Sequence, residues 1–181
     1  CNNVDHRIAQ QDVSLDAWMP ENALGMSLPE VASCDAFVLV GSELRFEQPM
    51  LNYRVRQAAR NGASVDVMHV IDSPFNFDLT SRVVDADLVA NVAALAAALG
   101  VDDPLFADLA ISAPVKAIAK RLKAAKRPIL MLGNYAYSHP DAMTLRTLAR
   151  LIERDTNVAV AYLTPGANAA GAWRAGMVPH R

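Results

Sequence analysis

Four short, mainly apolar runs punctuate the chain, and each ends at a glycine, an aspartate or a threonine–proline turn. Runs of this kind are typical of strands that are buried on both faces of a sheet. They lie at residues 36–40, 65–71, 129–132 and 158–163. Between them, apolar residues recur every three or four positions, which is the period of an amphipathic helix. The helical stretches lie at residues 49–60, 84–99, 114–127 and 145–152.

Strands that alternate with helix-sized connections indicate a parallel sheet, because a parallel crossover needs a connection of about that length. The sequence therefore predicts a three-layer α/β fold with a doubly wound, mostly parallel sheet of the Rossmann-like kind. Residues 1–34 are weakly patterned and are expected to form an irregular lead-in, while residues 35–181 form a single α/β domain. The chain does not begin with methionine and reads as a fragment of a longer protein.

Composition narrows the choice of partners. Of the 181 residues, 52% are hydrophobic and 20% are charged, so a packed domain is expected rather than disorder. The net charge of −2 gives no electrostatic reason to expect nucleic acid as a partner. No apolar run reaches the roughly 18 residues that a membrane span needs, so no direct membrane insertion is predicted.

The residues that bind metals are scattered. The two cysteines are 33 positions apart, and the four histidines form no group at the spacing of a metal site. A buried or surface role is the simpler interpretation of each histidine. We therefore predict no metal site, and no nucleophile with an adjacent base is recognisable either, so no catalytic residue is predicted.

In a doubly wound fold, ligands bind beyond the carboxyl ends of the strands, at the switch point between the two halves. We expect Gly41 and Gly133 to follow neighbouring strands there, with their loops lining one crevice. Each turn has a single glycine rather than a glycine-rich phosphate motif, so a tight turn is the simpler interpretation. The candidate site residues in these loops are Gly41, Ser42, Glu43, Arg45, Asp72, Gly133 and Asn134.

Three motifs carry a family resemblance. NVDHR at residues 3–7 is followed by QQD at 10–12, LVGSELRFEQP occupies 39–49, and GANAAGAW occupies 166–173. In this order they resemble segments of the large iron–sulfur subunit of bacterial respiratory NADH:quinone oxidoreductase (complex I). The matching part of that subunit is its C-terminal region, which is similar to molybdopterin oxidoreductases such as formate dehydrogenase and dimethyl sulfoxide reductase.

The resemblance implies a non-catalytic structural domain that supports electron transfer from NADH to quinone. It also implies other complex I subunits as partners, a place in the peripheral arm on the cytoplasmic side, and iron–sulfur clusters elsewhere in the subunit. No cofactor is expected in this fragment. Molybdopterin enzymes follow the first strand with Gly-x-Asn-Pro and the second with Asp-Pro-Arg, whereas this chain has GSEL at 41–44 and DSP at 72–74. The added acid and the missing arginine predict a vestigial pterin site.

Three alternatives stay open. The chain could be an oxidoreductase domain that does bind a nucleotide or molybdopterin dinucleotide, although Glu43 argues against a polyanion. It could be the central domain of a thiamine-diphosphate enzyme, which the pattern of residues 127–163 resembles. It could also be a scaffold domain of some other complex.

The C-terminal tail has no regular period, and residues 167–173 are expected to form a loop or a short turn. Trp173 lies there beside glycine and alanine residues that are too small to cover it. We therefore expect Trp173 to be partly exposed in the single chain, or covered only by another molecule.

Overall fold

The computed structural model describes residues 5, 12, 14–15, 19, 23–106, 109–166 and 168–178. Most of residues 3–12, the first motif of the family resemblance, and residues 179–181 thus lie outside the described part of the chain. The described residues form a five-stranded sheet in the order β3-β2-β1-β4-β5, and every neighbouring pair is parallel. The strands are β1 (Ala36–Val40), β2 (Ser64–His69), β3 (Ser81–Val84), β4 (Pro128–Leu132) and β5 (Ala159–Tyr162).

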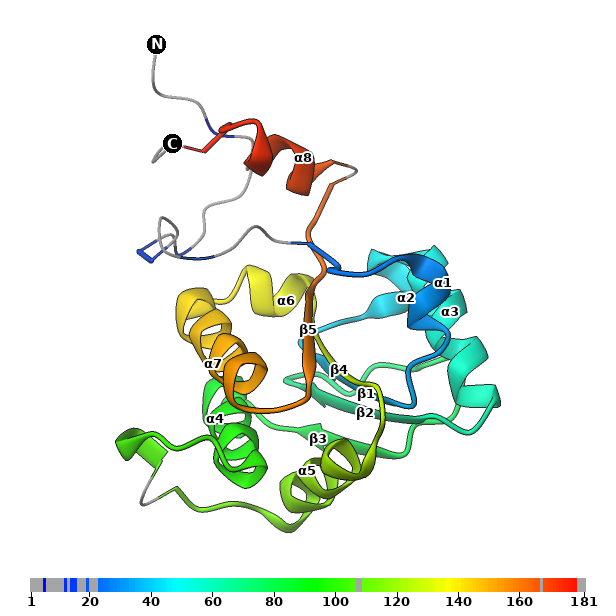
Figure 1. Ribbon diagram of the computed structural model, residues 1–181, viewed down its shortest axis with the longest axis vertical. Coiled ribbons are helices and arrows are strands. Elements are labelled where there is room, and N and C mark those ends of the chain that lie inside the picture. The colour runs from blue at the N-terminus through cyan, green and yellow to red at the C-terminus, as the bar shows by residue number, and fades with distance from the viewer. Residues whose placement is uncertain are drawn as a thin grey trace.

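Helices cover both faces of this sheet (Figure 1). They are α1 (Leu28–Val31), α2 (Leu44–Glu47), α3 (Pro49–Arg60), α4 (Leu88–Leu99), α5 (Ala113–Ala124), α6 (Asn134–Tyr137), α7 (Ala142–Asp155) and α8 (Ala169–Arg174), with a 3₁₀ turn at Pro104–Phe106. Helices α1, α2 and α3 pack on one face, and α4, α5 and α7 pack on the other. The predicted three-layer, doubly wound α/β fold is confirmed.

Two hydrophobic cores separate the three layers. Successive residues of a strand point to opposite faces, so Phe37 and Leu39 of β1 pack toward α1–α3 while Val38 and Val40 pack toward α4, α5 and α7. All five residues of β1 and all five of β4 are buried. Close packing of β1 and β4 therefore fixes the position of the turns that follow them.

Strand β3 corrects the sequence prediction. The stretch that contains Val84 was expected to be helical up to residue 99, but residues 81–84 form the edge strand, and α4 begins only at Leu88. The Asp87 side chain accepts a hydrogen bond from the N–H of Ala90, which caps the helix at that point. The strand is short and half exposed. Its only apolar residues, Val83 and Val84, are as compatible with a helix as with a strand, so the sequence pattern did not distinguish the two.

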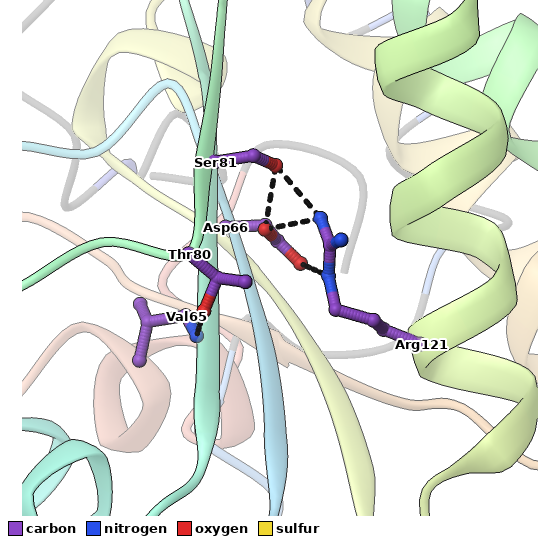
Figure 2. Close-up of polar contacts among 5 residues, drawn as sticks. All are labelled: Val65, Asp66, Thr80, Ser81 and Arg121. Carbon is purple, nitrogen blue, oxygen red and sulfur yellow. Dashed lines mark hydrogen bonds and ion pairs between the residues drawn. The ribbon is translucent and has the colours of Figure 1, made fainter.

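An ion pair between the sheet and α5 links this edge strand to the rest of the fold (Figure 2). Asp66 of β2 is buried, and the guanidinium of Arg121 on α5 donates to both of its carboxylate oxygens at 3.0 and 2.7 Å. Ser81 of β3 donates its hydroxyl to the same carboxylate at 2.7 Å and accepts from Arg121 at 2.8 Å. The ion pair of Asp66 and Arg121, with Ser81 bonded to both, thus joins β2, β3 and α5. We call it the Asp66 ion pair.

The C-terminal tail contains a short helix, α8, where the sequence predicted a loop or a short turn. Trp173 of α8 is only 2% exposed within the single chain, so the expectation of an exposed tryptophan was wrong. The buried guanidinium of Arg146, from α7, lies 5.8 Å from the centre of the Trp173 ring and 5.5 Å from that of Tyr162. A cation over the ring face covers what the small neighbours of Trp173 cannot cover. Burial raises the pKa of Tyr162 to about 12, although Arg146 opposes this shift.

Candidate functional site

The switch point lies between β1 and β4, since the chain continues from β1 toward β2 and from β4 toward β5. Gly41 and Gly133 follow these two strands directly. The predicted placement of both glycines at the carboxyl ends of neighbouring strands is therefore confirmed. The turns are also bonded to each other, because the N–H of Gly133 donates to the carbonyl of Val40 at 2.9 Å and that of Tyr135 donates to the carbonyl of Gly41 at 3.0 Å.

Glycine is required at both turns because of this contact. Gly41 has a φ of +56°, and a Cβ atom there would lie 2.7 Å from the backbone nitrogen of Ala136. A Cβ atom on Gly133 would lie 2.3 Å from the Cβ of Ser42. The two turns thus meet backbone to backbone at the edge of the sheet where doubly wound folds bind ligands.

Glu47 completes the contact between the turns. Its carboxylate accepts the Ser42 hydroxyl at 3.0 Å, the Glu43 N–H at 2.7 Å and the Asn134 N–H at 3.1 Å. The first two donors belong to the β1–α2 turn and the third to the start of α6. We call these four residues, Ser42, Glu43, Glu47 and Asn134, the Glu47 cluster. Peptide N–H groups that could bind an external anion are thereby satisfied by a carboxylate of the chain itself.

The other predicted site residues are divided between two places. Ser42 is buried, and Glu43 contributes its backbone N–H to the cluster. Arg45 is exposed and lies over the ring of Phe46 at 5.7 Å. Asp72 is exposed on the loop after β2, where it pairs with Arg82 of β3. Asp72 is therefore not one of the residues that bond the two glycine turns.

Sequence reasoning missed an aromatic row beside the cluster. His69, the last residue of β2, is buried, and its ring centre lies 5.2 Å from that of Tyr135, which lies 5.9 Å from that of His139. Burial lowers the pKa of His69, while the carboxylates of Glu43 and Glu47 oppose the shift. Its Nδ1 accepts the N–H of Ile71 at 3.0 Å, so the neutral ring carries its proton on Nε2. A histidine at the end of a strand was the only sequence signal.

The described residues contain no group of three or more His, Cys, Asp or Glu side chains that could hold a metal ion. Over the same residues, no helix has the length and apolar character needed to cross a membrane.

Comparison with known proteins assigns the family. The family model described as molybdopterin oxidoreductase matches residues 2–179, nearly the whole chain. The chain belongs to the molybdopterin oxidoreductase family. Within this molybdopterin oxidoreductase domain, the resemblance to the large complex I subunit is confirmed by the NADH-quinone oxidoreductase G subunit of Rickettsia felis, which is 27% identical over 155 residues. These residues make up 85% of this chain but only 20% of that relative.

A solved structure supports the fold of this molybdopterin oxidoreductase domain. It is the formyltransferase/hydrolase complex from Methylorubrum extorquens, determined in complex with methylofuran. One of its chains superimposes with a TM-score of 0.60 at 19% identity, over 87% of this chain and 46% of that chain. At this identity the likeness concerns the fold alone.

Proposed function

We propose that this chain is a non-catalytic structural domain of the G subunit of an NADH-quinone oxidoreductase. In this role it supports electron transfer from NADH to quinone without holding a cofactor itself. Its partners are other subunits of the complex, in the peripheral arm on the cytoplasmic side of the membrane. Iron–sulfur clusters belong to other parts of the longer polypeptide. The similarity to the Rickettsia felis protein and the family match support this assignment over a thiamine-diphosphate enzyme domain.

The observation that carries the proposal is the position of the Glu47 carboxylate. It accepts hydrogen bonds from both glycine turns, and the donor atoms lie 2.7 to 3.1 Å from its oxygens. A pyrophosphate group at this edge of the sheet would have to displace a carboxylate that already has three hydrogen-bond donors, and it would then lie close to two acidic side chains, Glu43 and Glu47. Repulsion between like charges at this distance opposes binding. The residues present therefore do not fit a pterin dinucleotide.

The loop after β2 supports the same proposal. The loop has no arginine at residues 72–74, where the resemblance to pterin-binding enzymes would place one. Arg82 reaches this loop from β3, but it donates to the Asp72 carboxylate and to the carbonyl of Ser73. Its charge is thus compensated within the chain and is not directed at the switch point.

The test is to purify the protein from the cells that make it, with an affinity tag on the polypeptide that contains this chain. We expect NADH-quinone oxidoreductase subunits to copurify in constant ratio, with NADH-dependent quinone reduction in the same fractions. Molybdenum and pterin should stay far below one equivalent per chain. A preparation without the other subunits, or one with an equivalent of molybdenum or pterin, contradicts the proposal.

A further inference from the structure

The outer side of α2 and α3 carries large apolar side chains. Phe46, Met50 and Tyr53 are 68%, 63% and 55% exposed, respectively. The opposite side of α3 is buried through Leu51 and Val55. Since α3 already packs its inner side on the sheet, these three residues do not belong to the core of this domain. A group of exposed large apolar residues is a feature of protein interfaces.

The same surface is basic. Segment 44–60 contains four arginines and one acid, and that acid is Glu47, whose carboxylate is bonded inward. Arg45 lies over the ring of Phe46, and Arg54 lies over the ring of Tyr53, each at 5.7 Å. The chain as a whole has a net charge of −2, so the excess of positive charge is local. Aromatic residues, methionine and arginine are the types enriched at the centres of interfaces.

Two hollows flank the exposed arginines Arg56 and Arg60. The first has a volume of about 370 Å³ and is also lined by Phe75, Phe77 and Asp78. The second has a volume of about 310 Å³ and is also lined by Tyr53. Because both arginines line both hollows, a carboxylate entering either one would lie near two guanidinium groups. The carboxylate of Asp78 offsets part of the positive charge of the first hollow, so the second hollow is the more favourable of the two for an acidic side chain.

We propose that this surface, defined by Phe46, Met50, Tyr53, Arg54, Arg56 and Arg60, docks an acidic segment of a neighbouring protein. Apolar side chains of that segment cover Met50 and Tyr53, and its Asp or Glu side chains enter the two hollows. The inference rests on the proposed function, in which the neighbour is another subunit of the oxidoreductase. It adds the surface that is used and the charge of the partner. The local excess of arginines complements an acidic protein segment. The net charge of −2 of the whole chain opposes a nucleic acid or an anionic lipid surface as the partner.

A photo-crosslinking amino acid at Met50 tests the proposal in the full-length polypeptide, produced in its own cells. The matched control carries the same group at Leu105, which is 84% exposed in the 3₁₀ turn on the opposite side of the sheet. We expect the Met50 probe to cross-link to another subunit, within a few residues of Asp or Glu side chains that mass spectrometry locates. The Leu105 probe should not reach that segment.

Charge variants show whether the arginines cause the contact. Arg56→Glu with Arg60→Glu should lower the Met50 cross-link yield about tenfold or more, because two attractions to the acidic segment become repulsions. Arg56→Lys with Arg60→Lys should keep most of the yield. Both residues are exposed, so the melting temperature should change little in either variant. Lysine at the mapped acidic positions of the partner should restore the cross-link to the double glutamate variant.

Several results overturn the proposal. Cross-links from Met50 only to lipid or RNA, cross-links to a segment without acids, the absence of any cross-link, or a yield that charge reversal leaves unchanged each do so. Copurification separates this failure from that of the proposed function. If the polypeptide still copurifies with the oxidoreductase, only the docking surface is wrong; if it does not, the assignment to the complex is wrong as well.

Discussion

Two carboxylates of this domain are stabilised by different kinds of group. Asp66 is 1% exposed, and its charge is compensated by the guanidinium of Arg121. Glu47 is half-buried at the carboxyl end of the sheet, and its described donors are one hydroxyl and two peptide N–H groups. The Asp66 ion pair connects two strands and a helix, whereas the Glu47 cluster connects two turns at the place where doubly wound folds hold ligands.

The difference shows that a carboxylate in this fold can either link secondary-structure elements or occupy an anion position. A buried ion pair is a weak source of net stability, but removing one of its members is costly. Its role is to fix the edge strand and α5 to β2. The Glu47 carboxylate instead takes the position that a ligand anion could occupy. The hydroxyl and N–H groups that donate to it could equally donate to such an anion. The first region is therefore expected to respond mainly in stability, and the second in both stability and binding.

The largest effect is expected from Arg121→Met. The change leaves the buried Asp66 carboxylate without its cation, and it should lower the free energy of unfolding by about 3–5 kcal/mol, as measured by urea denaturation. Asp66→Leu combined with Arg121→Met should recover most of this loss, because no buried charge remains. A single variant that loses less than about 1 kcal/mol would show that the ion pair does not hold the edge strand.

Glu47→Ala should cost about 2–3 kcal/mol in the same measurement, since three donors lose a charged acceptor and water replaces it only in part. Glu43→Gln is the matched control. It changes an acid in the same turn whose side chain makes none of the described bonds of the cluster, so its effect should stay within about 0.5 kcal/mol. Equal effects of the two variants would mean that charge at the turn, rather than the Glu47 bonds, matters.

Gly133→Ala should cost about 1–3 kcal/mol, because a Cβ atom would lie 2.3 Å from the Cβ of Ser42 and push the turns apart. Combined with Glu47→Ala, the loss should be smaller than the sum of the two single losses, since both changes open the same contact. Strict additivity in a double-mutant cycle would contradict a single connected site.

The smallest effect concerns pH. Burial holds the pKa of His69 below its ordinary value of 6.5 in the folded chain. As the pH falls below about 6.5, the unfolded chain takes up a proton that the folded chain resists, so stability is lost toward lower pH. His69→Asn keeps an acceptor for the N–H of Ile71 and removes the titrating group. Its stability should fall less between pH 7 and pH 5 than that of the wild type, as followed by urea midpoints at each pH.

Much of the fold was predictable because short, mainly apolar runs that end at turn residues mark buried parallel strands independently of distant contacts. The edge strand Ser81–Val84 was not, since half of it faces solvent and its stability comes from pairing with β2 and from the Asp66 ion pair. Trp173 was misjudged for a related reason. The guanidinium of Arg146, which lies over its ring, comes from α7 and is distant in sequence.

The candidate site was predictable in part. The glycines follow neighbouring strands as the switch-point rule predicts, and the rule needs no side-chain geometry. The role of Glu47 was not predicted, because it depends on the contact between the two turns, and Asn134 is 87 residues away. The four-residue spacing from Glu43 to Glu47 was the one local signal, since a side chain at the end of a single helical turn can reach back to the N–H at its start.

The most direct test of whether Glu47 takes the place of a ligand anion is a titration followed by the backbone amide signals of Glu43 and Asn134 in an ¹⁵N NMR spectrum. Inorganic pyrophosphate and molybdopterin dinucleotide are the two probes, with the wild type and Glu47→Ala compared at equal concentrations. We expect that neither amide signal of the wild type moves in a saturable way with either probe, because both N–H groups already donate to Glu47. Saturable movement of both wild-type signals with either probe would contradict this, since it would show that the N–H groups leave Glu47 for a ligand.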